Sequence, residues 1–163
     1  MSKGAQMRRA DKEITDRSEL ERLLDDAFVL HLGLVDDGRP YVVPLNFGRE
    51  GDALYVHGAA EGRKLRCLAA QPAVCVEVER LIRITKGETA CGEWTSHYES
   101  VIGFGTAHVL ADEAERERGL QAIMAKYSGR RDWSFKPETL AKTIVVRIDL
   151  ERLTGKRSPA RPA

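Results

Sequence analysis

Two tight turns in the first third of the chain constrain its fold more than any other feature. Asp36-Asp37-Gly38-Arg39 separates a mostly apolar segment at 27–35 from a second segment at 40–47, and Arg49-Glu50-Gly51-Asp52 leads into a third at 53–57. Turns of this composition are typical of β-hairpins, whereas parallel strands need long crossover connections. The sequence therefore predicts consecutive antiparallel strands and not a parallel βαβ sheet.

The rest of the chain continues the pattern of short strands with few helices. Alternating apolar and polar residues predict further strands at 73–79, 99–111 and 143–150. Capping residues and apolar spacing predict helices at 16–26, 62–70 and 112–127. We therefore expect an antiparallel barrel, mainly β with flanking helices.

Length and composition exclude several classes of protein. The 163 residues correspond to one domain, which we expect over 11–153 with flexible tails at 1–10 and 154–163. A net charge of +1 gives no general attraction to nucleic acid, and no apolar run approaches the length of a membrane span. The N-terminus has no secretory signal, and the three cysteines have no paired spacing, which favours a cytoplasmic location. The four histidines show no ligand spacing, so we expect no metal site.

The stretch 54–65 contains the strongest candidate binding site. A short strand ends in His57-Gly58-Ala59, a Gly-containing turn follows, and Arg63 and Lys64 open the next helix. Backbone N–H groups, a positive helix N-terminus and two cations then converge on one point, which suits a phosphate monoester. The alternative is a pair of solvated surface cations. The position of the pair directly after a strand and a small turn favours the anion site.

Two other positions allow both a structural and a functional interpretation. His57 shares a strand face with Tyr55, so packing or hydrogen bonding would explain it as well as a role at a ligand. Pro44 interrupts the strand 40–47, as prolines at sheet edges and bulges do. The same proline frees the following backbone from the ladder, which leaves N–H and C=O groups for a ligand.

Aromatic residues supply the least specific candidates. Trp94 and Tyr98 lie near the strand 99–111, and Trp133 follows a predicted helix. Core packing is the usual role of such residues, and stacking on a flat ring is the alternative. Gly103-Phe104-Gly105 lies inside a strand instead of opening a helix, so it is not a dinucleotide-binding fingerprint.

In this order, the segments 41–47, 54–65 and 94–105 resemble those of the FMN-binding split-barrel proteins related to pyridoxamine 5′-phosphate oxidase. The chain is most similar to the branch that includes the nitroimidazole-resistance reductases. The resemblance implies a six-stranded antiparallel split β-barrel that binds FMN between the two subunits of a homodimer. It assigns the FMN phosphate to Arg63 and Lys64. It places further residues at the flavin: Pro44, Leu45, Asn46, Phe47, His57, Gly58 and Ala59, with the strand of Tyr98, Ser100 and Val101 supplied by the second chain. Trp94 and Trp133 are further candidates at the flavin, Trp133 as a ring-stacking residue.

The resemblance also implies an activity. Members of this type pass electrons from the flavin to a small, flat acceptor, and His57 is the candidate catalytic residue. The sequence lacks the long basic C-terminal motif with which true pyridoxamine-phosphate oxidases bind their substrate, which argues against vitamin B6 oxidation. Two alternatives remain: a flavin-binding or flavin-buffering protein without turnover, and a haem-binding relative that uses His57.

Overall fold

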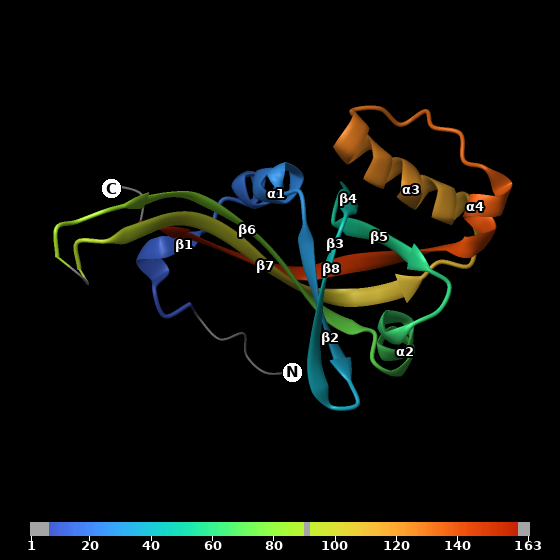
Figure 1. The fold of residues 1–163 in the computed structure, drawn as a ribbon, viewed down its shortest axis with the longest axis horizontal. Helices are drawn as coiled ribbons and strands as arrows, with labels where there is room; N and C mark the ends of the chain where they lie inside the picture. The colour runs from blue at the N-terminus through green and yellow to red at the C-terminus, as the bar shows by residue number, and fades with distance from the viewer. Residues whose placement is uncertain (1–6, 90–91, 160–163) are drawn as a thin grey trace.

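The computed structural model, which describes residues 7–89 and 92–159, is a curved antiparallel sheet with helices packed against it (Figure 1). The strands follow the order β3-β2-β6-β7-β8-β5-β4, and β1 pairs with β8 outside this order. Their bounds are β1 Glu13–Ile14, β2 Leu30–Asp36, β3 Arg39–Leu45, β4 Phe47–Glu50, β5 Ala53–Ala59, β6 Ala73–Thr85, β7 Thr95–Val109 and β8 Thr143–Ser158. The helices are the 3₁₀ turn η1 Ala10–Lys12 and α1 Arg17–Asp26, α2 Arg63–Ala70, α3 Glu113–Ser128 and α4 Pro137–Lys142.

The predicted fold class is confirmed, but the described residues form eight strands where the sequence predicted six. The predicted strand 40–47 divides at Asn46 and not at Pro44, which stays within β3 opposite His31: β3 ends at Leu45 and β4 begins at Phe47. The prediction that Pro44 interrupts the strand is therefore wrong, because β3 is an edge strand on which a proline is tolerated. Strand β1 has two residues, which is too short for alternation to reveal it. Helix α4 has six residues and begins at a proline, and the sequence analysis did not predict it.

Alternation along the strands decides which side chains form the core. On β2, Leu30, Leu32 and Leu34 are buried, and the residues between them face outward. A second cluster lies under α3, where Gly48 permits close packing: a Cβ there would collide with the backbone of Ala122. The two clusters hold α1 and α3 on the sheet, as Figure 1 shows.

The end of the chain differs from the prediction of a flexible tail from residue 154. Strand β8 continues to Ser158 and pairs with β7 throughout this part. Gly155 lets β8 pass directly beneath α1, because a Cβ there would collide with Leu20. Arg157 forms an ion pair with Glu19 of α1. These long-range contacts give order to a segment whose composition alone is polar and loop-like.

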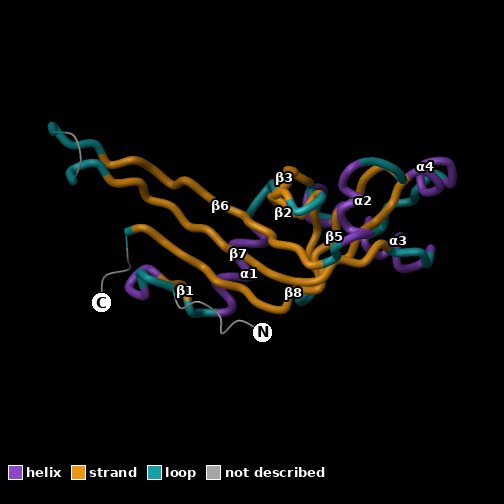
Figure 2. Tube along the Cα trace, turned by 90° about the horizontal axis from the view of Figure 1, so that it is seen from below, coloured by secondary structure: helices purple, strands orange, loops and turns teal. Residues whose placement is uncertain are grey.

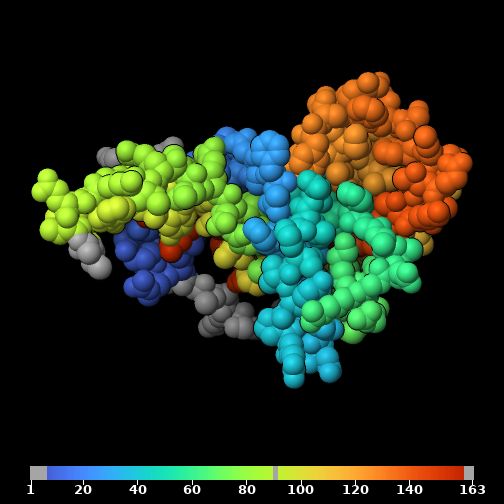
Figure 3. Space-filling view, viewed as in Figure 1, coloured from blue at the N-terminus to red at the C-terminus, as the bar shows by residue number. Residues whose placement is uncertain are grey.

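The distal parts of β6 and β7 extend as an arm away from α2, α3 and α4 (Figures 1 and 2). In the space-filling view this arm projects from the main body (Figure 3). Its apolar side chains are largely exposed: Leu81 is 62% exposed and Trp94, next to β7, is 49% exposed. We call residues 80–85 and 94–99 the arm.

No helix among the residues that the structure describes is long and apolar enough to cross a membrane.

Candidate functional site

The candidate site centres on the junction of β5 and α2, which we call the β5–α2 corner (residues 57–66). Gly62 precedes the helix with a φ of 124°, a backbone conformation that favours glycine. Within α2, the first N–H group with a helical partner is that of Arg66, which donates to the Gly62 carbonyl at 3.3 Å. No described side chain caps the helix. The preceding amides therefore point out of the helix end, as an anion site requires.

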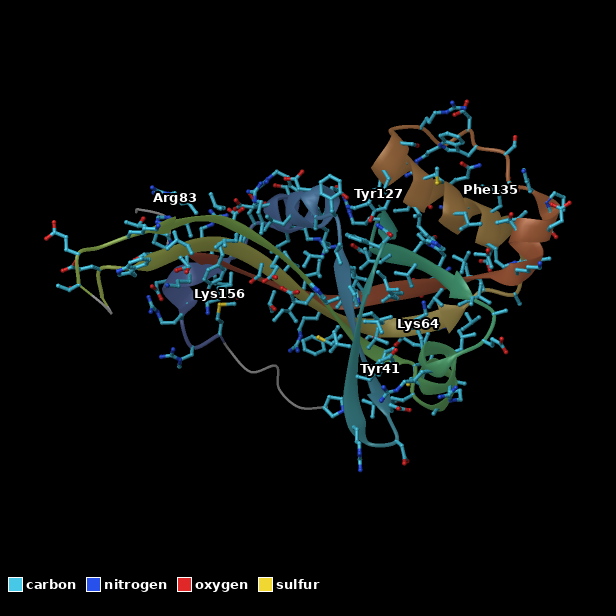
Figure 4. All side chains as sticks on the ribbon, in the orientation of Figure 1. Tyr41, Lys64, Arg83, Tyr127, Phe135 and Lys156 are labelled. Carbon is cyan, nitrogen blue, oxygen red and sulfur yellow. The ribbon has the colours of Figure 1, made fainter. Side chains whose placement is uncertain are left out.

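Lys64 lies against the end of β5 (Figure 4). Its Nζ donates to the His57 carbonyl at 3.2 Å, and a Cβ on Gly58 would lie only 2.7 Å from this nitrogen. Gly58 therefore provides the space in which the ammonium rests. Partial burial lowers the pKa of Lys64 from its usual value.

Arg63 has a different environment from its neighbour. Its Nε donates to Asp36 Oδ2 at 2.6 Å, and its guanidinium carbon lies 4.0 Å from the centre of the Tyr41 ring. Both partners belong to the β2–β3 hairpin. In the sequence, Asp36 is marked only as a turn residue, and Tyr41 carries no signal of its own. Only the packing of α2 against β2 brings these residues together.

His57 is exposed at the end of β5. Partial burial and the positive charge of Lys64 both lower the pKa of the imidazole from its usual value. The ring is therefore more completely neutral near pH 7 than a free histidine. A neutral, accessible imidazole can donate one hydrogen bond, accept another, or ligate a metal.

The segment 44–47 meets the end of β5. Phe47 pairs with Val56, which places Asn46 beside His57 at the rim of the sheet. Pro44 and Asn46 are exposed and Leu45 is half-buried. Phe47, by contrast, is fully buried beneath Lys126, and its N–H donates to Tyr127 Oη at 3.1 Å. Phe47 is thus a core residue whose side chain does not reach the surface.

The candidates on β7 lie in another part of the molecule. The ring of Tyr98 lies 5.9 Å from Nζ of Lys156, which Figure 4 places on the opposite side of the molecule from Lys64. Val101 is 1% exposed and packs in the core, so a ligand could meet only its backbone. Trp94 and Ser100 are accessible. One chain therefore does not bring this group to the β5–α2 corner.

Trp133 lies in the connection after α3. Its Nε1 donates to Ser128 Oγ at 2.9 Å, and its backbone is bound to the Gln121 side chain. The Arg130 guanidinium carbon lies 4.5 Å from the ring centre. These contacts attach the indole to α3 and cover part of its surface.

A pair of polar side chains that the sequence analysis did not select lies beside Pro44. His31 is the Cα partner of Pro44 across β2 and β3, and its Nδ1 lies 3.1 Å from Glu77 Oε2. Burial raises the pKa of Glu77. His31 also lines a cavity of about 420 Å³ that reaches Ser100. Its outward position on an alternating strand is the sequence signal that could have marked it.

The family model of pyridoxamine 5′-phosphate oxidase matches residues 16–157, nearly the whole described chain. A comparison with curated proteins found no match.

Solved structures with the same architecture include flavin- and haem-binding proteins. A candidate 5-nitroimidazole antibiotic resistance protein from Bacteroides thetaiotaomicron is 28% identical over 89% of this chain and 86% of its own, with a TM-score of 0.80. The FAD and heme binding protein of Mycobacterium smegmatis is 30% identical over 93% of this chain and 76% of its own, with a TM-score of 0.81. The flavocytochrome Anf3 of Azotobacter vinelandii is 23% identical over the full chain and 77% of its own, with a TM-score of 0.83, and shows the shared fold.

Proposed function

The chain belongs to the pyridoxamine 5′-phosphate oxidase family, and from that premise we propose that it is a flavoprotein that binds FMN between the two subunits of a homodimer. We propose further that it is an oxidoreductase of the nitroimidazole-reductase type. The observation that carries the proposal is the β5–α2 corner, where free helix amides and the side chains of Arg63 and Lys64 suit a phosphate group.

The residues present fit a flavin mononucleotide. Arg63, Lys64 and the first amides of α2 would hold the phosphate. The outer edge of β3 at Pro44 and Leu45, with Asn46 outside the ladder, would meet the polar edge of the ring system. His57 and Gly58 lie between these two places. The flavin, when bound, supplies the electron-transfer chemistry. His57 would orient the acceptor or move a proton at its imidazole nitrogens.

The need for a second chain is supported by the separation of the candidate residues. Tyr98 lies by Lys156, well apart from Lys64, so Tyr98 and the β5–α2 corner can meet at one ligand only across an interface, whereas Ser100 reaches the cavity beside Pro44 within one chain. An apolar surface is available for that interface: Val42, Ile102 and Phe104 are each at least 40% exposed on the outward face of the sheet. A groove of about 500 Å³ runs over the same face between Val42 and Phe104.

Measurement of FMN and riboflavin affinities tests the phosphate assignment. Each charge-assisted contact contributes about 1.5–3 kcal/mol, so Arg63→Ala and Lys64→Ala should each weaken FMN binding by roughly ten- to a hundredfold. Riboflavin has no phosphate and should bind weakly, with nearly the same affinity in all three proteins. Equal FMN affinity in the wild type and the double variant would refute the assignment.

Haem binding is a second candidate, because a relative at 30% identity is described as binding both FAD and haem. The exposed His57 is a suitable axial ligand. The absorption spectrum of the purified protein separates a flavin from a haem. Mass analysis of the released cofactor then separates FMN from FAD. A protein that holds flavin but does not reduce a nitroaromatic acceptor with a reduced nicotinamide would be a flavin carrier without turnover.

A further inference from the structure

The side chain of Arg63 is held by residues outside its own helix. The Asp36 carboxylate at the end of β2 accepts its Nε–H at 2.6 Å, and the Tyr41 ring of β3 lies 4.0 Å from its guanidinium carbon. An arginine normally loses much rotamer freedom when it binds a ligand. Here the hydrogen bond to Asp36 and the stacking on Tyr41 already restrict the orientation of the guanidinium group.

The hairpin that supplies both partners is itself well defined. Asp37 and Gly38 have φ values of 50° and 76°, so they form a tight two-residue turn between β2 and β3. Asp36 Oδ1 also lies 3.6 Å from Sγ of Cys67, which is buried in α2. The Asp36 carboxylate thus connects β2 to two successive turns of α2. It is set by the fold and is not a mobile surface group.

The bond to Asp36 leaves the outer edge of the guanidinium unused. An arginine has five N–H donors, and Asp36 takes the one on Nε. Among the residues that the structure describes, none is hydrogen-bonded to Nη1 or Nη2 of Arg63. The neighbouring charges of Lys64 and Arg66 keep the corner positive despite the Asp36 carboxylate. A phosphate can therefore take the two outer nitrogens while the Nε contact remains.

Resting on the function proposed above, we propose that Asp36 is a positioning residue of the phosphate site, which acts through Arg63 and does not touch the ligand. Asp36 and Tyr41 hold the guanidinium with its outer N–H groups free at the first turn of α2. Preorganisation of this kind raises affinity because the ordering cost is met before the ligand binds. The alternative is that Asp36 acts against binding. Its carboxylate would then repel the phosphate and compete with it for Arg63.

The two roles predict opposite changes in the FMN affinity of Asp36→Ala, and Asp36→Asn shows whether the hydrogen bond suffices without the charge. A positioning role predicts that Asp36→Ala weakens FMN binding by roughly two- to tenfold, the cost of ordering one free side chain. Asp36→Asn should bind FMN at least as tightly as the wild type, because its amide oxygen still accepts from Nε and carries no negative charge. Riboflavin affinity should stay unchanged in both variants.

Asp37→Asn is the matched control. Asp37 is the adjacent, exposed turn residue, and asparagine tolerates its left-handed conformation. Its FMN and riboflavin affinities should equal those of the wild type. If Asp36→Ala binds FMN as tightly as the wild type, or more tightly, the positioning role is refuted.

A second pair of variants keeps the test decisive if Asp36→Ala does not fold. Tyr41→Phe retains the ring beneath Arg63 and should bind FMN normally, whereas Tyr41→Leu removes it and should lose about as much affinity as the Asp36 change. Equal FMN affinity in these two variants would overturn the proposal. Failure of the proposed function has a different signature, because the wild type would then show no preference for FMN over riboflavin.

Discussion

The β5–α2 corner and the arm differ in whether their exposed side chains have partners in the same chain. In the corner, the cations have partners in the same chain: Arg63 has Asp36 and Tyr41, and Lys64 has the His57 carbonyl. In the arm, Leu81, Ile82, Ile84 and Trp94 are all about half or more exposed. Single exposed apolar residues are ordinary, but four of them within one short arm favour a binding surface there.

This difference separates the site that one chain builds by itself from the part that the proposed dimer would complete. The corner holds its polar groups in position before any ligand arrives. The arm exposes apolar area that water does not favour, and it carries Tyr98 and neighbours that the proposed flavin site requires. The corner would then set the affinity for the phosphate, and the arm would set the assembly. Three experiments test this division.

The largest expected effect follows a charge placed in the arm. In a twofold-symmetric dimer, Leu81→Glu introduces two charges into the interface, and burial of an unpaired charge is strongly unfavourable. The dimer dissociation constant should rise at least about a hundredfold, which corresponds to about 2.7 kcal/mol. Sedimentation equilibrium measures it. FMN affinity should fall with dimerisation, since the two are linked.

Arg83→Gln is the control for the arm, because Arg83 is an exposed arm residue whose change removes a charge without adding one to the apolar group. Its sedimentation should match that of the wild type. A Leu81→Glu protein that remains dimeric would show that the arm is not part of the interface, which would then rest on the face with Val42, Ile102 and Phe104 alone. A monomeric wild type that binds FMN stoichiometrically would refute the shared site.

An intermediate effect is expected where the corner makes room for Lys64. In Gly58→Ala, the new methyl group would lie 2.7 Å from the present position of Nζ, so the ammonium must move. Loss of its phosphate contact should weaken FMN binding about tenfold, with riboflavin unaffected. Titration calorimetry on Gly58→Ala, Lys64→Ala and the double variant measures the coupling between the two positions. The double variant should be no weaker than Lys64→Ala, and additive losses would contradict the steric explanation.

The smallest effect concerns the pH dependence of His57. Because Lys64 lowers the pKa of His57, Lys64→Met should shift the transition in flavin reoxidation by a nitroaromatic to higher pH. Burial still disfavours the imidazolium, so the transition should remain below the usual pKa of a histidine. Stopped-flow profiles between about pH 5 and pH 8 measure the shift. His57→Asn should lack the transition, and a profile identical to that of the wild type would remove His57 from the catalytic residues.

The starts of α1, α2 and α3 and the hairpins could be predicted because their signals are local. Asp16 caps α1 by accepting the Ser18 N–H at 2.9 Å, and the Asp37-Gly38 turn joins β2 to β3. Both follow from residues close to each other in the sequence. The division of the strand 40–47 and the extension of β8 to Ser158 depend on distant partners. No local pattern contains that information.

The same distinction between local signals and contacts with distant residues applies to the candidate site. The sequence by itself determined that Arg63 and Lys64 open a helix after a small turn, because chain geometry over a few residues suffices for that. Only the tertiary structure decided that Arg63 meets Asp36, a carboxylate 27 residues earlier, while Lys64 meets the backbone of β5. It also decided that Phe47 is buried and that His31 lies beside Pro44. Neighbours in the sequence are fixed by covalent bonds, whereas these contacts exist only when the sheet has formed and α2 is packed against it.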